Sequence, residues 1–262
     1  MTDSGSFTTK DGLRLQTRTW LPDAEPQANV LLIHGYGDHC GRYAEFAQVL
    51  NQTSFGVYAY DQRGFGRSEG RRGYVADFDA LLADLDLFIQ QVQPNIAGKP
   101  VFMLGQSFGG LIVVRYAETR QPDLAGLVLC SPFLGFPENV PPALLTLGRY
   151  IAAVAPWMPV SKVDIHGLSR RPEVAEEAEN DPLSYHGKVH ARTGVQMQKA
   201  VESAFADIAN LSVPLFIAHG GADSVVPVSG STRFFEQCPV EDKTLRVFEG
   251  GYHELWHDLE AD

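Results

Sequence analysis

The sequence has little of three features that would each indicate a particular class of protein. It contains only three cysteines, Cys40, Cys130 and Cys238, and their odd number and wide spacing predict no disulfide framework. Basic residues are few: 21 Lys and Arg stand against 32 Asp and Glu, and the net charge is −11. Because nucleic acids are bound largely by basic side chains that neutralise phosphates, this balance argues against a nucleic-acid partner.

The third missing feature is a long hydrophobic run. Residues 1–12 lack the basic and apolar segments of a signal peptide, so a cytoplasmic protein is expected. Residues 140–160 are nearly all apolar, but their prolines leave about 13 residues for a helix, fewer than the roughly 20 that span a bilayer. We therefore predict a buried helix here. The alternative is that this segment contacts a lipid surface, as in a peripherally membrane-associated protein.

Six short apolar runs recur along the chain. They are rich in Val, Ile, Leu and Phe, which is typical of strands that are buried on both faces of a sheet. Helical patterns lie between them, and this alternation indicates a mainly parallel sheet between layers of helices. An alternating stretch at 13–20, preceded by Asp11 and Gly12, predicts an opening hairpin. The six runs are NVLLIHG (29–35), GVYAYD (56–61), VFMLGQ (101–106), AGLVLCSP (125–132), VPLFIAHG (213–220) and TLRVFEGG (244–251).

One interval interrupts this alternation of strands and helices. Residues from about 133 to 211 contain helical patterns and prolines but no strand-like run. The interval is too long to be a simple loop. We therefore predict a single α/β domain over residues 1–262, with a helical cap inserted at about 133–211 above the functional site.

The pattern G-x-S-x-G, which serine hydrolases use at their nucleophile, occurs at 66–70 and again at 105–109. A nucleophile elbow requires a strand, a sharp turn and a helix, so that the serine hydroxyl stands above the sheet. Ser107 follows the apolar VFML and precedes the helical pattern LIVVRYAE, whereas Ser68 has neither neighbour. Ser107 is therefore the predicted nucleophile, and Ser68 is interpreted as a loop serine.

A serine nucleophile needs a histidine base and an acid that orients the base. In folds with this elbow, the acid and then the histidine follow the serine along the chain. Asp223 comes after the run at 213–220 and His253 after the run at 244–251, so both are expected beside Ser107. The backbone N–H groups of Tyr36 and Phe108 are the predicted donors to the oxyanion of the reaction.

Three other polar residues also stand at the ends of predicted strands. Asp61 precedes the nucleophile in the sequence, so we interpret it as a residue that caps its own loop. His34 and His219 lie at or beside strand ends, where a histidine is more often a packed, hydrogen-bonding residue than a base.

The segment HELWH at 253–257 offers a different chemistry. Two histidines four residues apart on a helix can bind Zn²⁺, with Glu254 as the base of a zinc peptidase. Zinc requires a third protein ligand, and only DLEAD follows His257. We therefore prefer the interpretation that His253 is the catalytic histidine at the start of a short helix, with no metal and no cofactor. A zinc peptidase is the alternative.

Six blocks appear in order from residue 34 to residue 258. They are HGYGDHCGRY (34–43), DQRGFGRSEG (61–70), GQSFGG (105–110), NDPLSYHG (180–187), HGGADSVVP (219–227) and GYHELWHD (251–258). Taken together, they resemble the monoacylglycerol lipase and lysophospholipase group of the α/β-hydrolase superfamily. The resemblance implies an α/β-hydrolase fold, with a mostly parallel eight-stranded sheet flanked by helices and a mobile helical cap.

The resemblance also implies a function. It indicates a serine esterase that cleaves single-chain lipid esters, such as monoacylglycerols or lysophospholipids, through an acyl-enzyme on Ser107 and without a metal. The triad and oxyanion donors that it assigns are the residues predicted above. Asp38 and Arg42 match positions near the glycerol end of the pocket in that group. An ion pair that fixes their loop is an equally good interpretation of these two residues.

Other functions remain compatible with the same fold. A serine aminopeptidase or amidase would need acidic cap residues to hold a substrate amine, and RPEVAEEAEND at 171–181 offers such acids, although a solvated helix face explains them equally well. An acyltransferase would differ only in excluding water. A catalytically silent lipid-binding protein is the non-enzymatic alternative, and the intact set of Ser107, Asp223 and His253 argues against it.

Overall fold

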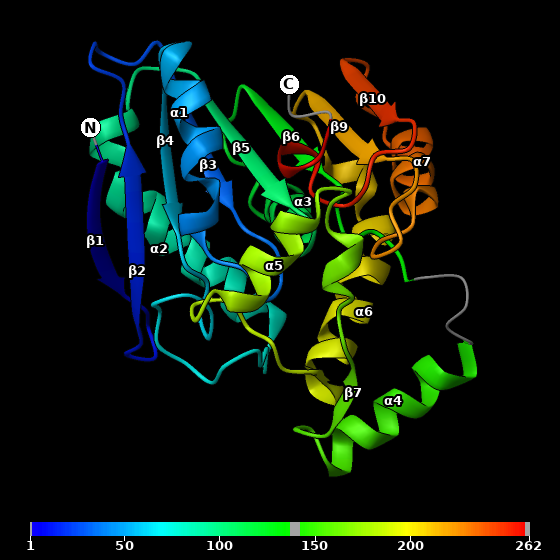
Figure 1. Ribbon diagram of the computed structural model, residues 1–262. Coiled ribbons are helices and arrows are strands. Elements are labelled where there is room, and N and C mark those ends of the chain that lie inside the picture. The colour runs from blue at the N-terminus through cyan, green and yellow to red at the C-terminus, as the bar shows by residue number, and fades with distance from the viewer. Residues whose placement is uncertain (1, 137–141, 260–262) are drawn as a thin grey trace.

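The computed structural model describes residues 2–136 and 142–259, which form a twisted eight-stranded sheet with helices on both faces (Figure 1). The strand order is β1-β2-β4-β3-β5-β6-β9-β10. β1 and β2 form the predicted opening hairpin, β2 also pairs antiparallel with β4, and the remaining pairs are parallel. The strands are β1 (Thr2–Thr8), β2 (Arg14–Trp20), β3 (Ala28–Ile33), β4 (Phe55–Tyr60), β5 (Val101–Gln106), β6 (Gly126–Cys130), β9 (Leu215–Gly220) and β10 (Lys243–Phe248).

Side chains that alternate along the central strands divide the core into two layers. Leu31 and Ile33 of β3 point into the larger layer, together with apolar side chains of the helices α2 (Phe78–Ile96), α3 (Phe108–Arg120), α6 (Ala191–Ala206) and α7 (Val228–Gln237). Val30 and Leu32 point into the other layer, which packs beneath α1 (Ala44–Gln52). This alternation is why the central runs are apolar without interruption.

The sixth predicted strand is less buried than its sequence suggests. The apolar runs predict strands covered on both faces, yet Val247 of β10 is 46% exposed and Phe216 of β9 is 37% exposed. β10 pairs only with β9 and therefore lies at an edge of the sheet. An apolar run indicates a strand, but it does not reveal which strand lies at an edge.

The segment between β6 and β9 is mostly helical, as predicted. It contains α4 (Pro142–Val154), η2 (Ile165–Gly167), α5 (Pro172–Asn180), α6 and η3 (Ile208–Asn210). Residues 137–141 of the predicted cap lie outside the described residues. The expectation that the segment has no strand is wrong, because β7 (Pro159–Ser161) pairs antiparallel with β8 (Val189–His190). This pairing is too short to leave an apolar run in the sequence.

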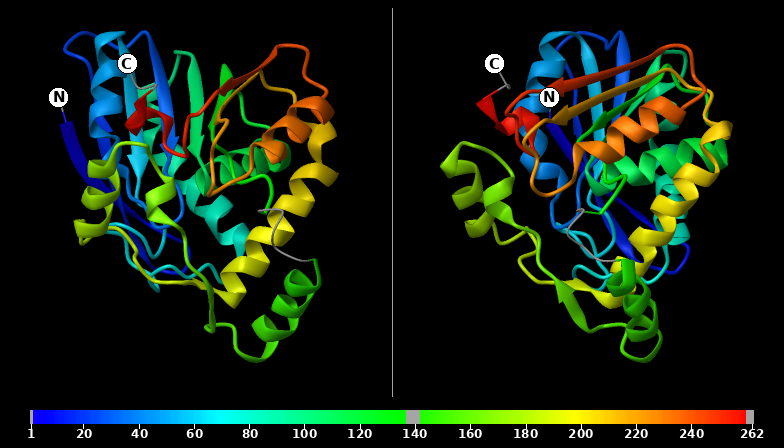
Figure 2. Two further views of the ribbon diagram at one scale, coloured as in Figure 1. Left: turned by 45° about the vertical axis from the view of Figure 1, so that its right-hand side comes forward. Right: turned by 90° about the vertical axis from the view of Figure 1, so that its right-hand side faces the viewer.

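The two ends of this segment differ in their distance from the sheet. α6 packs against the body and contributes Met197, Ala200 and Ala204 to the larger core layer. α4 packs on α6 and stands farthest from the sheet in both views of Figure 2. The prediction of a buried helix at 140–160 is wrong for the described part of this range, because Tyr150 is 71% exposed and Val154 is 80% exposed. Within the part of the chain that the structure describes, no helix is long and apolar enough to cross a bilayer.

Candidate active site

The G-x-S-x-G pattern at 105–109 lies between β5 and α3. β5 ends at Gln106 and α3 begins at Phe108, so Ser107 occupies the turn between them, with φ 50° and ψ −116°. Such a conformation costs a non-glycine residue about 1–3 kcal/mol. The flanking Gly109 permits the turn, because a Cβ atom there would collide with the carbonyl oxygen of Ile33. The predicted strand, sharp turn and helix are therefore present.

The loops after β9 and β10 bring Asp223 and His253 together. The Nδ1 atom of His253 lies 2.7 Å from Oδ2 of Asp223. The other carboxylate oxygen accepts hydrogen bonds from the backbone N–H groups of Val225 and Val226, at 2.8 and 2.9 Å. Burial alone would raise the pKa of Asp223, but His253, His219 and the backbone donor of Val226 outweigh it and hold this pKa well below its usual range. Asp223 is therefore an anion that can fix the orientation of the imidazole.

Ser107 and His253 line the same cavity, which has a volume of about 410 Å³. The side chain of Gln106, next to Ser107, donates a hydrogen bond of 3.1 Å to the carbonyl oxygen of His253 and so joins the two loops. The walls are mostly apolar, as expected of a site for a hydrophobic ligand. The apolar side chains in the wall are Phe108, Phe133, Phe136, Ile151, Val160, Val163, Leu168, Val189, Ala191, Val195, Met197, Val225 and Val226.

The predicted oxyanion donors lie on the two segments that flank Ser107. Phe108 is the first residue of α3, where backbone N–H groups have no partner within the helix. Tyr36 follows β3, and a Cβ atom on the preceding Gly35 would lie 3.4 Å from Cβ of Ser107. The phenol of Tyr36 donates to the carbonyl oxygen of Gly73 at 2.8 Å, so this hydroxyl is already engaged and only the backbone of Tyr36 remains a candidate donor.

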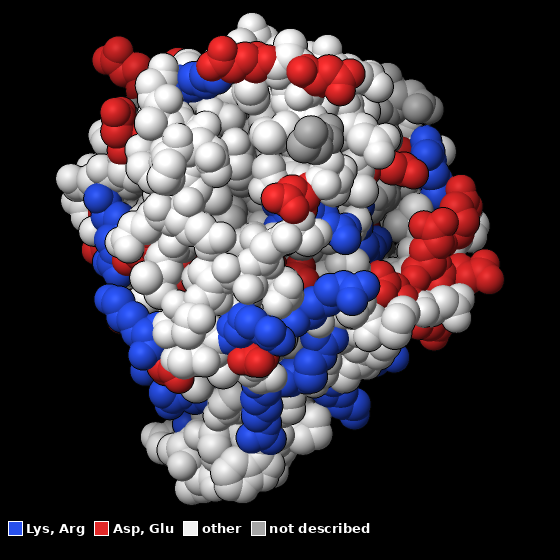
Figure 3. Space-filling model, turned by 90° about the vertical axis from the view of Figure 1, so that its left-hand side faces the viewer, with Lys and Arg blue, Asp and Glu red and all other residues white. Residues whose placement is uncertain are grey.

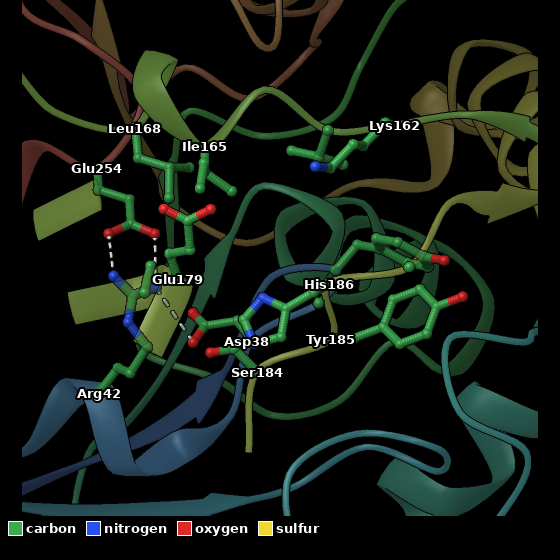
Figure 4. A pocket seen from close by; sticks show the side chains of 15 residues that line it. Asp38, Arg42, Lys162, Ile165, Leu168, Glu179, Ser184, Tyr185, His186 and Glu254 are labelled. Atoms are coloured by element: carbon green, nitrogen blue, oxygen red, sulfur yellow. Dashed lines mark hydrogen bonds and ion pairs between the residues drawn. The ribbon is translucent and has the colours of Figure 1, made fainter. Parts of the chain in front are cut away.

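A smaller cavity of about 100 Å³ adjoins the apolar one (Figure 4). Most of its lining surface is also apolar, but we call it the polar cavity because charged side chains, among them Asp38, Arg42 and Glu179, line it. Both terminal nitrogens of the Arg42 guanidinium donate to Glu254, each at 2.8 Å, and Nη1 also lies 3.4 Å from Oδ1 of Asp38. Both interpretations of Asp38 and Arg42 therefore have a structural basis, because the two residues pair with each other and also line the cavity. Six residues line both cavities: Tyr36, Asp38, Lys162, Val163, Leu168 and Glu254.

The polar cavity contains residues that sequence reasoning missed. Glu254 was considered only as the base of a zinc site, yet it is the partner of Arg42. Burial would raise the pKa of Glu254, but Arg42 and His257 outweigh burial and lower it to about 2. Lys162 and Glu179 reach the cavity from the segment between β6 and β9. No sequence pattern signals these two, because their position depends on how that segment lies over the sheet.

The two histidines and the glutamate of HELWH each contact a protein partner. His253 binds Asp223, Glu254 binds Arg42, and Nδ1 of His257 lies 2.8 Å from Glu254. Leu255–His257 form a 3₁₀ turn, η4, so the motif does not have the α-helical geometry that places two zinc-binding histidines on one face. Across the described ranges 2–136 and 142–259, no group of three or more His, Cys, Asp or Glu side chains is arranged to hold a metal ion.

The other candidate residues have structural roles, as the sequence indicated. The hydroxyl of Ser68 donates to the carbonyl oxygen of Asp61 and accepts the N–H of Gln16 at 2.8 Å. The Asp61 carboxylate accepts two backbone N–H groups at 2.8 Å, one from Cys40 and one from residue 67, and so caps its loop. Nε2 of His34 accepts the backbone N–H of residue 62 at 2.9 Å, in the interior.

Comparison with known proteins gives a consistent result. The profile of the hydrolase family described as "Serine aminopeptidase, S33" matches residues 24–260. The monoglyceride lipase of Rattus norvegicus is 35% identical over 250 residues, which cover 95% of this chain and 82% of that protein. The monoacylglycerol lipase of Mycolicibacterium smegmatis is 33% identical over 255 residues, which cover 97% and 91%. The crystal structure of Paleococcus ferrophilus monoacylglycerol lipase superposes with a TM-score of 0.82 at 32% identity, covering 99% of this chain and 93% of that one. The predicted α/β-hydrolase fold is thereby confirmed.

Proposed function

The chain belongs to the serine aminopeptidase S33 family of hydrolases, and on this premise we propose that it hydrolyses monoacylglycerols through an acyl-enzyme on Ser107. The observation that carries the proposal is the cavity that Ser107 and His253 line together, with Asp223 bound to His253. The relatives that share most of its length are named as monoglyceride and monoacylglycerol lipases. Other single-chain lipid esters, including lysophospholipids, fit the same chemistry.

The reaction follows from the roles of five groups. His253 accepts the hydroxyl proton of Ser107 as the serine oxygen attacks the ester carbonyl, and Asp223 stabilises the imidazolium that forms. The N–H groups of Phe108 and Tyr36 stabilise the oxyanion of the tetrahedral intermediate. His253 then gives its proton to the leaving glycerol oxygen. A water molecule, activated by the same histidine, releases the fatty acid and restores the serine.

The two cavities suggest how the substrate lies. The acyl chain occupies the apolar cavity. Transfer of the chain from water into this cavity favours binding by about 0.8 kcal/mol for each CH₂ group that is buried. The glycerol hydroxyls occupy the polar cavity, where Asp38, Glu254 and Glu179 supply acceptors and Lys162 supplies a donor. The ester carbon then lies where the two cavities meet, beside Ser107.

The segment at about 133–211 acts in this proposal as a cap over a single domain. It supplies much of the apolar wall, including Phe136, Ile151 and Val195. A substrate chain would therefore be enclosed between the sheet and this segment. The acidic run at 171–181, which an aminopeptidase would need, places Glu179 in the polar cavity, while Glu176 and Glu177 are exposed on α5. A single acid from this run, in a cavity that also contains Lys162, is weak support for recognition of a substrate amine.

The outer end of the cap is a candidate contact with a lipid surface. Tyr150, Val154 and Trp157 are exposed there, and the exposed basic residues Lys162 and Lys188 adjoin the short β7–β8 sheet. Figure 3 shows basic side chains gathered beside an uncharged tip at the bottom of the molecule. Apolar and aromatic side chains bordered by basic ones are typical of surfaces that lie in the interface of a membrane. Substrate could reach the cavity from such a surface.

Replacement of Ser107 by alanine tests the proposal directly. Removal of the nucleophile should lower kcat for monoacylglycerol hydrolysis on the order of 10⁴-fold or more. Ser68→Ala is the matched control, because it changes the serine of the other G-x-S-x-G pattern and should leave turnover per folded molecule nearly unchanged. Release of glycerol from purified variants, normalised to folded protein, measures both. Turnover that survives in Ser107→Ala would contradict the assignment.

A further inference from the structure

A second histidine contacts the carboxylate that binds His253. Nε2 of His219 lies 3.3 Å from Oδ2 of Asp223, the same oxygen that lies 2.7 Å from Nδ1 of His253. His219 lies on β9, its side chain is completely buried, and it is not among the residues that line the two cavities described above. It therefore stands behind the candidate acid, on the side away from the substrate.

The neighbours of His219 determine where its ring carries hydrogen. Nε2 faces two acceptors, the carbonyl oxygen of Val226 at 3.1 Å and the carboxylate of Asp223. Because neither acceptor can donate, Nε2 must carry a hydrogen in every charge state of the ring. Nδ1 lies 2.7 Å from the hydroxyl of Ser231 on α7, which is also fully buried. Ser231 thus fixes the plane of the ring, and the ring directs an N–H group at Asp223.

We propose that His219 is a positioning residue for the catalytic acid. The Nε2–H group of His219 is hydrogen-bonded to the carbonyl oxygen of Val226 and also lies 3.3 Å from the oxygen of Asp223 that binds His253, while two backbone N–H groups bind the other carboxylate oxygen. The three hydrogen bonds and this contact restrict the orientation of the carboxylate and favour its charged form. The proposal rests on the catalytic role proposed above for Asp223 and His253.

The balance between the two histidines has a consequence for proton transfer. An N–H group from His219 disperses the negative charge that holds the proton on His253. Without it, the carboxylate attracts that proton more strongly, so His253 becomes an active base only at higher pH. Cys130 at the end of β6 interacts electrostatically with Asp223, and Glu254, which follows His253 in the chain, is paired with Arg42.

His219→Leu removes both ring nitrogens while keeping an apolar side chain of moderate size. We expect kcat to fall on the order of 10-fold, as for the loss of one hydrogen bond to a charged group. The acid limb of the pH profile of kcat/KM should also move upward by roughly 0.5 to 1 pH unit. His219→Gln, whose amide can donate to the same acceptors, should restore both values. A residue with only a structural role would change the folded fraction without moving this limb.

A milder variant covers the case in which His219→Leu does not fold. Ser231→Ala removes the hydroxyl that fixes the ring, and we expect a fall in kcat of about 3-fold with a smaller shift of the limb in the same direction. Thr232→Ala is the control, because its hydroxyl donates to the carbonyl oxygen of Val228 within α7 rather than to the ring of His219. All rates are normalised by titration of the reactive serine with a fluorophosphonate.

The outcomes separate this proposal from the proposed function. If the wild-type pH profile persists in folded His219→Leu and in Ser231→Ala, the positioning role is refuted while the triad stands. If Ser107→Ala keeps its turnover, the proposed function fails whatever the His219 variants show. A loss of rate in His219→Leu that Gln does not restore, without movement of the limb, would also refute the positioning role.

Discussion

The two halves of the segment between β6 and β9 are attached to the body in different ways. The half that contains η2, α5 and β8 is bound to the loops of the candidate site by directional bonds. The backbone N–H of Glu254 donates to the carbonyl oxygen of Leu168 at 2.7 Å, and Nε2 of His39 donates to Asp181 at 2.7 Å. The half that contains α4 packs on α6 mainly through apolar side chains such as Ile151 and Val195, and its directional contacts with α6 include the exposed ion pair of Arg149 with Glu202.

The half that contains η2, α5 and β8 lines both cavities and supplies charged residues to the polar one, whereas α4 lines the apolar cavity. This difference suits the parts of the ligand that the two cavities would hold. Hydrogen bonds and ion pairs fix distances and angles, so the anchored half can place donors and acceptors for a glycerol group. Apolar contacts are less directional, so the outer half can accommodate acyl chains of different lengths. Geometric precision at the headgroup and tolerance at the chain follow from the two modes of attachment.

We expect Glu254→Gln to have the largest effect on stability, through the loops to which the anchored half of the segment is bound. Arg42 would lose its charged partner in a buried position, and the free energy of unfolding at pH 7 should fall on the order of 3 kcal/mol. The pKa of Glu254 is lowered from 4.5 to about 2, so its ionic contribution is fully present above pH 4.5 and is lost as the pH falls toward 2. Urea unfolding of both proteins from pH 7 to pH 3 measures this difference, which should shrink below pH 4.5.

The control for this prediction is Glu179→Gln, which changes an exposed glutamate of the same cavity. It should leave the free energy of unfolding nearly unchanged at every pH. A loss in Glu254→Gln that stays constant down to pH 3 would mean that the ionised pair does not stabilise the fold, and that the neutral shape of the side chain is what matters.

Gly194→Leu would test the apolar cavity, which α4 also lines. Gly194 lines the apolar cavity from α6, and a Cβ atom there would meet no heavy atom within 4 Å. A leucine can therefore fill the space for the acyl chain without displacing its neighbours. We expect kcat/KM for long-chain monoacylglycerols to fall on the order of 10-fold or more, while short-chain esters change little. A panel of monoacylglycerols of graded chain length measures the ratio.

Gly194→Ala serves as the matched control. It gains helix propensity of about 0.8 kcal/mol, as the leucine variant largely does, but it leaves most of the cavity open. If both variants lower the rate for all chain lengths to the same degree, the backbone of α6 is responsible and the cavity does not hold the chain.

Local patterns explain which parts of the site could be predicted from the sequence. The elbow around Ser107 depends on a strand, small residues and a helix that are adjacent in the chain, so it was predictable. Asp223 and His253 follow from strand order, because the ends of successive parallel strands meet at one edge of the sheet. The pair between Arg42 and Glu254 joins residues 212 positions apart, and nothing in either local sequence indicates the partner.

The outer half was harder to predict for a related reason. An apolar segment such as 140–160 indicates that some surface is buried, but its sequence does not say whether protein or lipid covers it. Val154 and Trp157 are exposed although their neighbour Ala152 is buried against α6. The pairing of β7 with β8 was missed because Pro159 and two further residues carry no periodic signal.

The smallest expected effect concerns the surface of the outer half. Trp157→Ser removes an aromatic side chain that is 56% exposed near the end of α4. If this surface enters a lipid interface, the loss should weaken partition into vesicles by about 1 kcal/mol, or roughly fivefold. Co-sedimentation with vesicles of phosphatidylcholine and phosphatidylglycerol measures the partition, and hydrolysis of a water-soluble short ester should be unchanged.

Val49→Ser is the control, because Val49 is 57% exposed on α1, far from α4 in Figure 1. Equal losses of partition in the two variants would show that exposed apolar area in general, rather than the outer half of the cap, determines binding. A loss of activity on the soluble ester would instead mean that Trp157 supports the wall of the cavity. The boundary between the anchored half and the adaptable outer half would then lie closer to the tip of the cap.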